Sequence, residues 1–224
     1  AVCRPQPSFT IAHVAVDAAG GVWVAPELTK DVSRFDGTTW STPPSDPAWT
    51  ADRGGANAWP VSLVAADDGS LWLAFGGLGH YQAKTWTSAA TDAVDLSGTV
   101  SLAAAPDGSA WLATGSVSLP GDEWGLYSGI AVAHVDGGSW TVYDSADGLP
   151  APEPSRATIT AVAASSQAVI AATRDGFYRL SGDRWVRVGR SPAAAPAWAQ
   201  KLLAVSAREA WAASDDGLWH ARDG

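Results

Sequence analysis

The chain has 224 residues, of which 46% are apolar and 17% are charged, and its formal net charge is −9. This composition excludes a disordered chain, and the length predicts one domain with a core of its own. The 23 acidic residues outnumber the 14 basic ones, which argues against nucleic-acid binding, and no apolar run is long enough to cross a membrane. One cysteine forms neither an internal disulfide nor a Cys-rich zinc site, and the sequence predicts no metal and no cofactor.

A unit of two short apolar runs around a turn recurs five times along the chain. Each copy has a tryptophan, or once an isoleucine, eleven residues after its start. The copies read AHVAVDAAGGVWVA (12–25), VSLVAADDGSLWLA (61–74), VSLAAAPDGSAWLA (100–113), ITAVAASSQAVIAA (159–172) and QKLLAVSAREAWAA (200–213). Turn signals between short apolar runs predict β-hairpins, and no helix is expected.

A second hairpin follows the first in four of the five units. It reads RFDGTTW (34–40), HYQAKTW (80–86), HVDGGSW (134–140) and RLSGDRW (179–185). Four strands per unit predict an all-β, five-bladed β-propeller of four-stranded antiparallel blades. We expect blades at 11–42, 61–88, 100–143, 159–188 and 200–224, which form a single domain over residues 1–224.

The ends of the chain predict how the ring closes. The fifth unit stops in the turn before its fourth strand, and we expect residues 1–5 to supply that strand. Cys3 then stands where other blades have Trp40 or Trp140. Pairing of the N- and C-terminal strands closes the ring and removes exposed sheet edges.

Most of the aromatic residues have a structural explanation. We expect the repeated tryptophans to fill the gaps between blades. The third-strand position holds either histidine or arginine, and we expect it to donate hydrogen bonds that staple the blades. The position holds Arg34, His80, His134, Arg179 and His220, and we expect the three histidines to lie too far apart to bind one metal.

The turn motifs DGSLW (68–72), DGSAW (107–111) and YDSADGLP (143–150) resemble the two-component-regulator propeller repeat. The resemblance covers essentially the whole chain. It implies an extracytoplasmic sensory propeller that binds a ligand in front of a membrane span and a signalling domain such as a histidine kinase. Two features depart from that family, because such sensors usually have more than five blades and this chain contains neither a membrane span nor a kinase segment.

Polar residues recur ten positions before the repeated tryptophan or isoleucine. We expect them on the innermost strands, around the central channel, as a ligand-binding ring or as the solvated lining of a pore: His13, Ser62, Ser101, Thr160 and Lys201. No carboxylate occurs among them. A glycoside hydrolase needs two carboxylates at its centre, so this ring argues against an enzyme.

Long connections, at 43–60, 88–99, 144–158 and 189–199 and in an insertion at 115–129, are expected at one mouth of the channel. They carry the tryptophans that the repeat leaves unexplained, with Arg53 nearby: Trp49, Trp59, Trp124 and Trp198. Such side chains stack on sugars, aromatic groups or cations, or they pack the connections onto the disc. Both interpretations stay open.

The favoured prediction is a noncatalytic sensory domain that binds its ligand at the loop-rich mouth of the channel and is located extracytoplasmically. Its partner is a small molecule or glycan, or a protein on the face of the disc. A five-bladed carbohydrate-binding lectin is the alternative, with a glycoside hydrolase less favoured. Because the sequence begins at Ala1 without a leader, we expect a processed protein or an excised domain.

Overall fold

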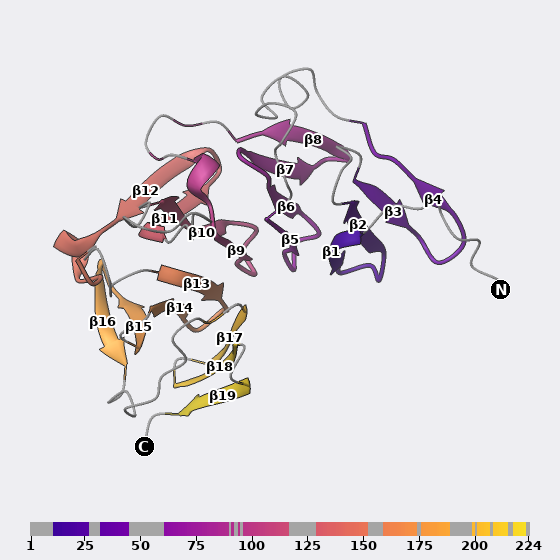
Figure 1. The fold of residues 1–224 in the computed structure, drawn as a ribbon. Helices are drawn as coiled ribbons and strands as arrows, with labels where there is room; N and C mark the ends of the chain where they lie inside the picture. Colours follow the sequence, from indigo (N-terminus) through magenta and orange to yellow (C-terminus); the bar gives the residue numbers. More distant parts are fainter. Residues whose placement is uncertain are drawn as a thin grey trace, which may run out of the picture.

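The computed structural model describes residues 11–26, 32–44, 61–89, 91, 94, 96–116, 129–151, 159–173, 176–188, 199, 201–206, 208–214 and 217–222. Its antiparallel strands form five small blades around a centre, which confirms the predicted five-bladed β-propeller (Figure 1). The described residues contain no α-helix and two short 3₁₀ turns, η1 (Leu96–Gly98) and η2 (Ser145–Asp147).

The strands of each blade pair in chain order. Blades 1 and 2 contain β1 (Ile11–Val16), β2 (Val22–Pro26), β3 (Ser33–Phe35) and β4 (Trp40–Ser41), then β5 (Ser62–Ala65), β6 (Leu71–Ala74), β7 (Leu78–Gln82) and β8 (Thr85–Ser88). Blades 3 and 4 contain β9 (Ser101–Ala104), β10 (Ala110–Ser116), β11 (Gly129–Asp136) and β12 (Ser139–Tyr143), then β13 (Ile159–Ala164), β14 (Val169–Thr173), β15 (Gly176–Ser181) and β16 (Arg184–Val188). Blade 5 contains β17 (Lys201–Ser206), β18 (Glu209–Ser214) and β19 (Gly217–Arg222).

The blades follow one another along an arc. Successive inner strands contact each other from β1 through β5, β9 and β13 to β17. Blades 1 and 5 lie at opposite ends of this arc (Figure 1). Residues 1–5, which we expect to supply the fourth strand of blade 5, lie outside the described residues, and closure by that strand stays a prediction.

The Asp-Gly-Ser turns owe their shape to hydrogen bonds within the turn. The Asp68 carboxylate accepts from the Ser70 amide at 2.9 Å and from the Ser70 hydroxyl at 2.6 Å. Asp107 accepts from Ser109 in the same way, at 3.0 and 2.7 Å. Side-chain acceptors of this kind fix a tight turn, so these carboxylates explain why DGS precedes the repeated tryptophans of blades 2 and 3.

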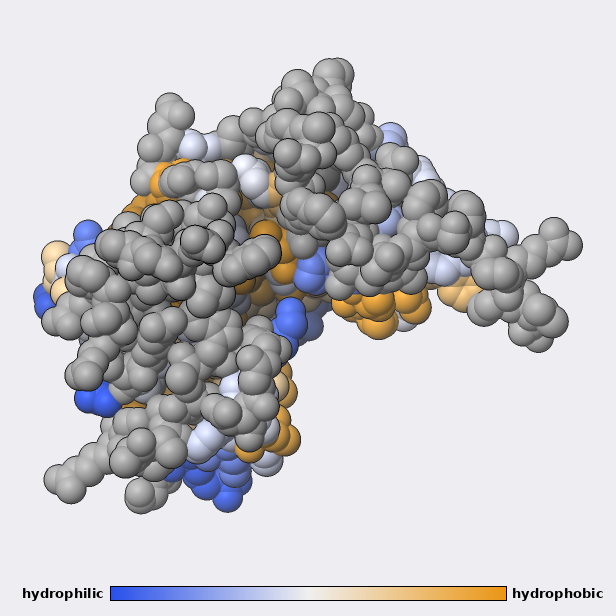
Figure 2. Space-filling view, in the orientation of Figure 1, coloured by the Kyte–Doolittle hydropathy of each residue, from blue (hydrophilic) through white to orange (hydrophobic). Residues whose placement is uncertain are grey.

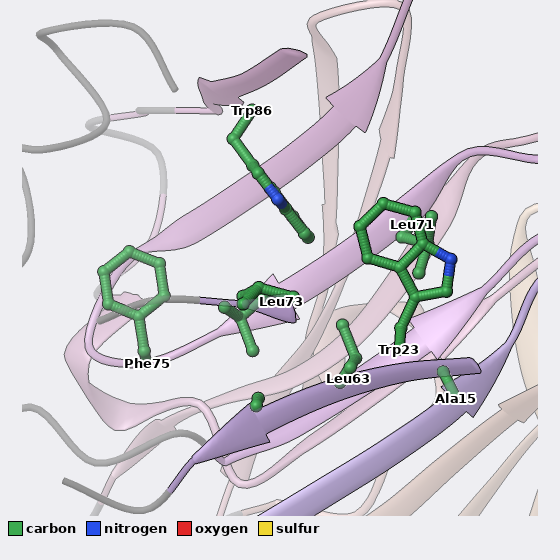
Figure 3. Packing of buried hydrophobic residues seen from close by; sticks show 9 residues of the cluster. Ala15, Trp23, Leu63, Leu71, Leu73, Phe75 and Trp86 are labelled. Atoms are coloured by element: carbon green, nitrogen blue, oxygen red, sulfur yellow. The ribbon is translucent and has the colours of Figure 1, made fainter. Parts of the chain in front are cut away.

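The repeated tryptophans fill the spaces between blades, as predicted. We call the face of a blade that meets the next blade its forward face, and the opposite one its back face. Trp23, on the forward face of blade 1, is buried against the back face of blade 2, which includes Leu71 and Leu73 (Figure 3). Its ring meets Tyr81 and Trp86 edge-on, with centroids 4.6 and 6.3 Å apart. The core of the molecule is therefore a series of junctions between blades.

The motif YDSADGLP forms part of one junction. The Asp144 carboxylate caps η2 by accepting from the Ala146 amide at 2.6 Å, and Asp147 accepts from the Asp144 amide at 3.0 Å. Gly148 ends the turn with a φ of +99°. Leu149 is then buried in the cluster that joins blades 3 and 4. The motif therefore leads the chain out of blade 3 and places Leu149 in the junction between blades 3 and 4.

Candidate functional site

Four of the five polar residues predicted on the inner strands share one register position. Each lies opposite an alanine of the second strand of its blade: His13, Ser62, Ser101 and Lys201 face Ala25, Ala74, Ala113 and Ala213 respectively. Equal register in successive blades places these residues at equivalent points along the inner strands. Four of the five predicted residues therefore occupy the same position in their respective blades.

Thr160 occupies a different position, in a bulge between Ile159 and Ala161. Ala161, and not Thr160, lies opposite Ala172, the second-strand alanine of blade 4. The cause is the first hairpin of blade 4, whose connection (165–168) is one residue shorter than that of blade 2 (66–70). Counting back from Ile170 therefore lands one residue away from the equivalent position.

The five residues predicted on the inner strands differ in accessibility. Ser62 and Thr160 are buried, and the Thr160 hydroxyl donates to the Ala172 carbonyl at 3.4 Å. The Ser101 hydroxyl accepts from the Val162 amide of blade 4 at 3.1 Å, which links two blades. Lys201 is exposed and His13 is half-buried. Lys201 and His13 are therefore the more accessible basic groups, at the two ends of the arc.

The predicted connection residues cannot be placed in the site. Trp49, Trp59, Trp124, Trp198 and Arg53 lie outside the described residues. Their contribution to a binding site stays a prediction.

The carboxylate of Asp17, just beyond the end of the inner strand β1, has a structural role. The buried Asp17 accepts hydrogen bonds from Trp23 Nε1 at 2.8 Å, the Gly21 amide at 2.7 Å and Arg34 Nε at 2.9 Å. Burial acts to raise the pKa of Asp17, but the hydrogen bonds from Trp23, Gly21 and Arg34 outweigh it and hold the pKa below its usual value. Asp17 therefore stays ionised as a structural acceptor.

Replacing Asp17 with asparagine is expected to destabilise the fold at pH 7 by about 2 kcal/mol, because charge-assisted hydrogen bonds are lost. The folded pKa lies below the unfolded one, so the carboxylate stabilises the fold above about pH 5 and this contribution fades as the pH falls. Thermal unfolding at pH 7 and at pH 3 tests this, and the gap between wild type and Asp17→Asn should shrink at pH 3. An equal gap at both pH values would contradict the role of the charge.

The third-strand residue stacks on the repeated tryptophan in blades 1, 2, 3 and 5, whereas Arg179 of blade 4 lies opposite Ile170. Arg34 lies above the ring of Trp23, with its guanidinium carbon 5.6 Å from the centroid. Histidine stacks on the tryptophan opposite it in three blades, with centroids 3.9 to 4.1 Å apart: His80 on Trp72, His134 on Trp111 and His220 on Trp211. Burial lowers the pKa of both His80 and His134. Arg34 also forms a hydrogen bond with Asp17, and His220 with Glu209, and both bonds staple strands within one blade.

No protein-family model and no curated protein matches the sequence. Solved structures match in fold. YCF48 bound to D1 peptide has a TM-score of 0.61 at 14% identity, over 100% of this chain and 67% of that one. Virginiamycin B lyase from Staphylococcus aureus has a TM-score of 0.60 at 13% identity, over 97% of this chain and 71% of that one. The extracellular domain of BT4673 from B. thetaiotaomicron, assigned to a one-component system, has a TM-score of 0.60 at 12% identity. That match covers 98% of this chain and 28% of the BT4673 chain.

At these identities the similarity shows a shared propeller fold. The chain spans about two thirds of YCF48 and of the lyase, and 28% of the BT4673 domain. The fold thus occurs in a peptide-bound protein, in an enzyme and in the extracellular domain of a signalling protein. Among the described residues, no helix has the length and apolar character that spanning a membrane requires.

Proposed function

We propose that this chain is a noncatalytic, ligand-binding sensory domain of a bacterial signalling receptor and works outside the cytoplasm. The observation that supports it is the chemistry of the inner strands, because β1, β5, β9, β13 and β17 contain no aspartate or glutamate. Asp17, just beyond β1, is held by Trp23 and Arg34. Such strands offer donors for a ligand but no pair of carboxylates for acid and base catalysis. The extracellular BT4673 domain, a neighbour in fold, gives further support.

The accessible groups favour a small ligand that carries negative charge or many hydroxyls. Lys201, which is exposed on β17 opposite Ala213, supplies a cation on a chain whose net charge is −9. Anionic sugars and dicarboxylates are therefore the first compounds to screen.

A thermal-shift screen with uronic acids, neutral monosaccharides and dicarboxylates, followed by calorimetric titration, tests the proposal. We expect Lys201→Gln to weaken binding of an anionic hit at least tenfold, because one charged hydrogen bond is lost. Lys84→Gln is the matched control, since Lys84 is exposed in the outer β7–β8 turn. Equal effects of the two substitutions, or turnover of any compound in the panel, would contradict the proposal.

The same screen separates the two remaining interpretations. Saturable glycan binding that Trp59→Ala abolishes without a change in unfolding temperature would support the lectin alternative. A protein partner is favoured by the fold neighbour YCF48, which is bound to a peptide. A separate binding assay with a library of unstructured peptides tests for a protein partner. Saturable peptide binding, together with the absence of any small-molecule hit, would support a protein partner.

A further inference from the structure

Each junction between consecutive blades joins two unlike faces. The forward face contributes the repeated tryptophan or isoleucine. The back face of the next blade covers that side chain with a recurring set of apolar positions. In blade 2 this back-face set consists of Leu63, Ala65, Leu71, Leu73, Tyr81 and Trp86. The buried clusters of the described residues join blades 1 and 2, 2 and 3, 3 and 4, and 4 and 5, and none of them joins the back face of blade 1 to the forward face of blade 5.

The back face of blade 1 has the same apolar composition as that of blade 2. Its equivalent positions, assigned from the strand register, are Val14, Val16, Val22, Val24, Phe35 and Trp40. Val14 and Val16 are 56% and 59% exposed, whereas Leu63, the equivalent of Val14, is buried in the first junction. Val24 on this face is 8% exposed, so the exposed apolar part of the back face of blade 1 lies at Val14 and Val16.

The forward face of blade 5 presents the complementary half. Trp211 is half-buried, although Trp72 at the same position in blade 2 is buried in a junction. Leu218 is 70% exposed, and its equivalent Leu78 is 1% exposed. Leu203, opposite Trp211, is 60% exposed. Contiguous exposed apolar side chains of this kind mark interaction surfaces in soluble proteins.

The two faces lie apart within one chain. Blades 1 and 5 form the two ends of the arc, and apolar surface borders its open side beside β1 and beside β17 (Figures 1 and 2). We propose that two copies of this chain associate head to tail, with the forward face of blade 5 of one copy packed on the back face of blade 1 of the other. The contact continues the series of blade junctions, because it unites the same two kinds of face. The proposal does not require the proposed function, although Lys201, which pairs with Ala213, lies on the same face of blade 5 as Leu203 and Trp211.

The interface is heterologous, since different faces of the two copies meet. Such contacts close into a ring or extend into a filament, according to the rotation between copies. Each copy carries a net charge of −9, so their repulsion opposes contact at low ionic strength. We therefore expect association to strengthen when salt is added.

Light scattering and sedimentation of the full chain, across a hundredfold range of concentration, test the proposal. The mass is expected to rise above the 23.0 kDa of one chain as the concentration increases. Leu203→Glu and Val14→Glu should each weaken association at least tenfold, because a charge is placed in an apolar contact. Val186→Glu is the matched control, because Val186 is an exposed valine on the outer strand β16.

Mixing the two variants makes the test specific. The Leu203→Glu chain keeps an intact back face, and the Val14→Glu chain keeps an intact forward face. Their equimolar mixture should form a one-to-one dimer and nothing larger, although each variant alone stays monomeric. Misfolding of either variant cannot produce this restoration.

Three outcomes would overturn the proposal. The first is a dimer that both substitutions leave unchanged. The second is a wild-type monomer that binds no hydrophobic dye and loses thermal stability with either substitution, which would show that the two faces meet within one chain. The third is a wild-type monomer that binds the dye strongly, which would show that these faces take a different partner.

Discussion

Replacing Gly148 with alanine is expected to lower the unfolding temperature by about 6–12 °C, which corresponds to a loss of about 3 kcal/mol for a chain of this length. Gly148 has a φ of +99°, a conformation that costs an L-residue about 1–2 kcal/mol. A Cβ at this position would also overlap the backbone oxygen of Trp185 in β16. The turn that seats Leu149 in the junction between blades 3 and 4 would then have to move.

Gly37→Ala separates these two contributions. Gly37 has a φ of +100°, and a Cβ there would meet nothing within 4 Å. We expect it to cost about 1 kcal/mol, or about 2–4 °C, through backbone conformation alone. Thermal unfolding followed by circular dichroism compares the two variants. Equal shifts would show that contact with Trp185 adds nothing.

Replacing Trp23 with alanine is expected to cost about 3–5 kcal/mol, because a buried aromatic side chain leaves a cavity between blades 1 and 2. The substitution also removes the indole hydrogen bond to Asp17. Trp211→Ala changes the same repeat position in blade 5, where the ring is half-buried. We expect it to cost about 1–2 kcal/mol in dilute protein, since less apolar surface leaves water there.

Urea denaturation of both tryptophan variants, at low protein concentration, measures the difference. A cost for Trp211→Ala as large as that for Trp23→Ala would show that the forward face of blade 5 is already covered within the single chain. With increasing protein concentration the two costs should approach each other, because head-to-tail association buries Trp211.

The five blades could be predicted from the sequence because their signals are local. Alternating apolar runs define strands, and turns such as Asp68–Gly69 define hairpins wherever they occur in the chain. The position of Thr160 could not be predicted by counting, since one missing residue in the first hairpin of blade 4 shifts the register. That hairpin contains Ser165 and Gln167 where blade 2 has Asp67 and Gly69, but blade 5 has Ser206 and Arg208 there without this shift, so residue type alone gives no signal of it.

Other features depend on contacts between distant parts of the chain. The stacking of His80 on Trp72 follows from strand register, whereas the recurrence of histidine in the sequence indicates only a hydrogen-bond donor. The link from Ser101 to Val162 depends on how two blades meet. The exposure of Val14 and Leu203 depends on the curvature of the whole arc, which no local pattern encodes.

Because one set of contact positions recurs at the blade junctions, such proteins can gain or lose blades during evolution. A gene segment that encodes one blade can be duplicated or deleted without a new type of interface, because each forward face already fits each back face in kind. Trp23 and Trp72 illustrate this, since both pack against equivalent back-face positions of the following blade. The number of blades is therefore free to vary while every blade keeps the same internal design.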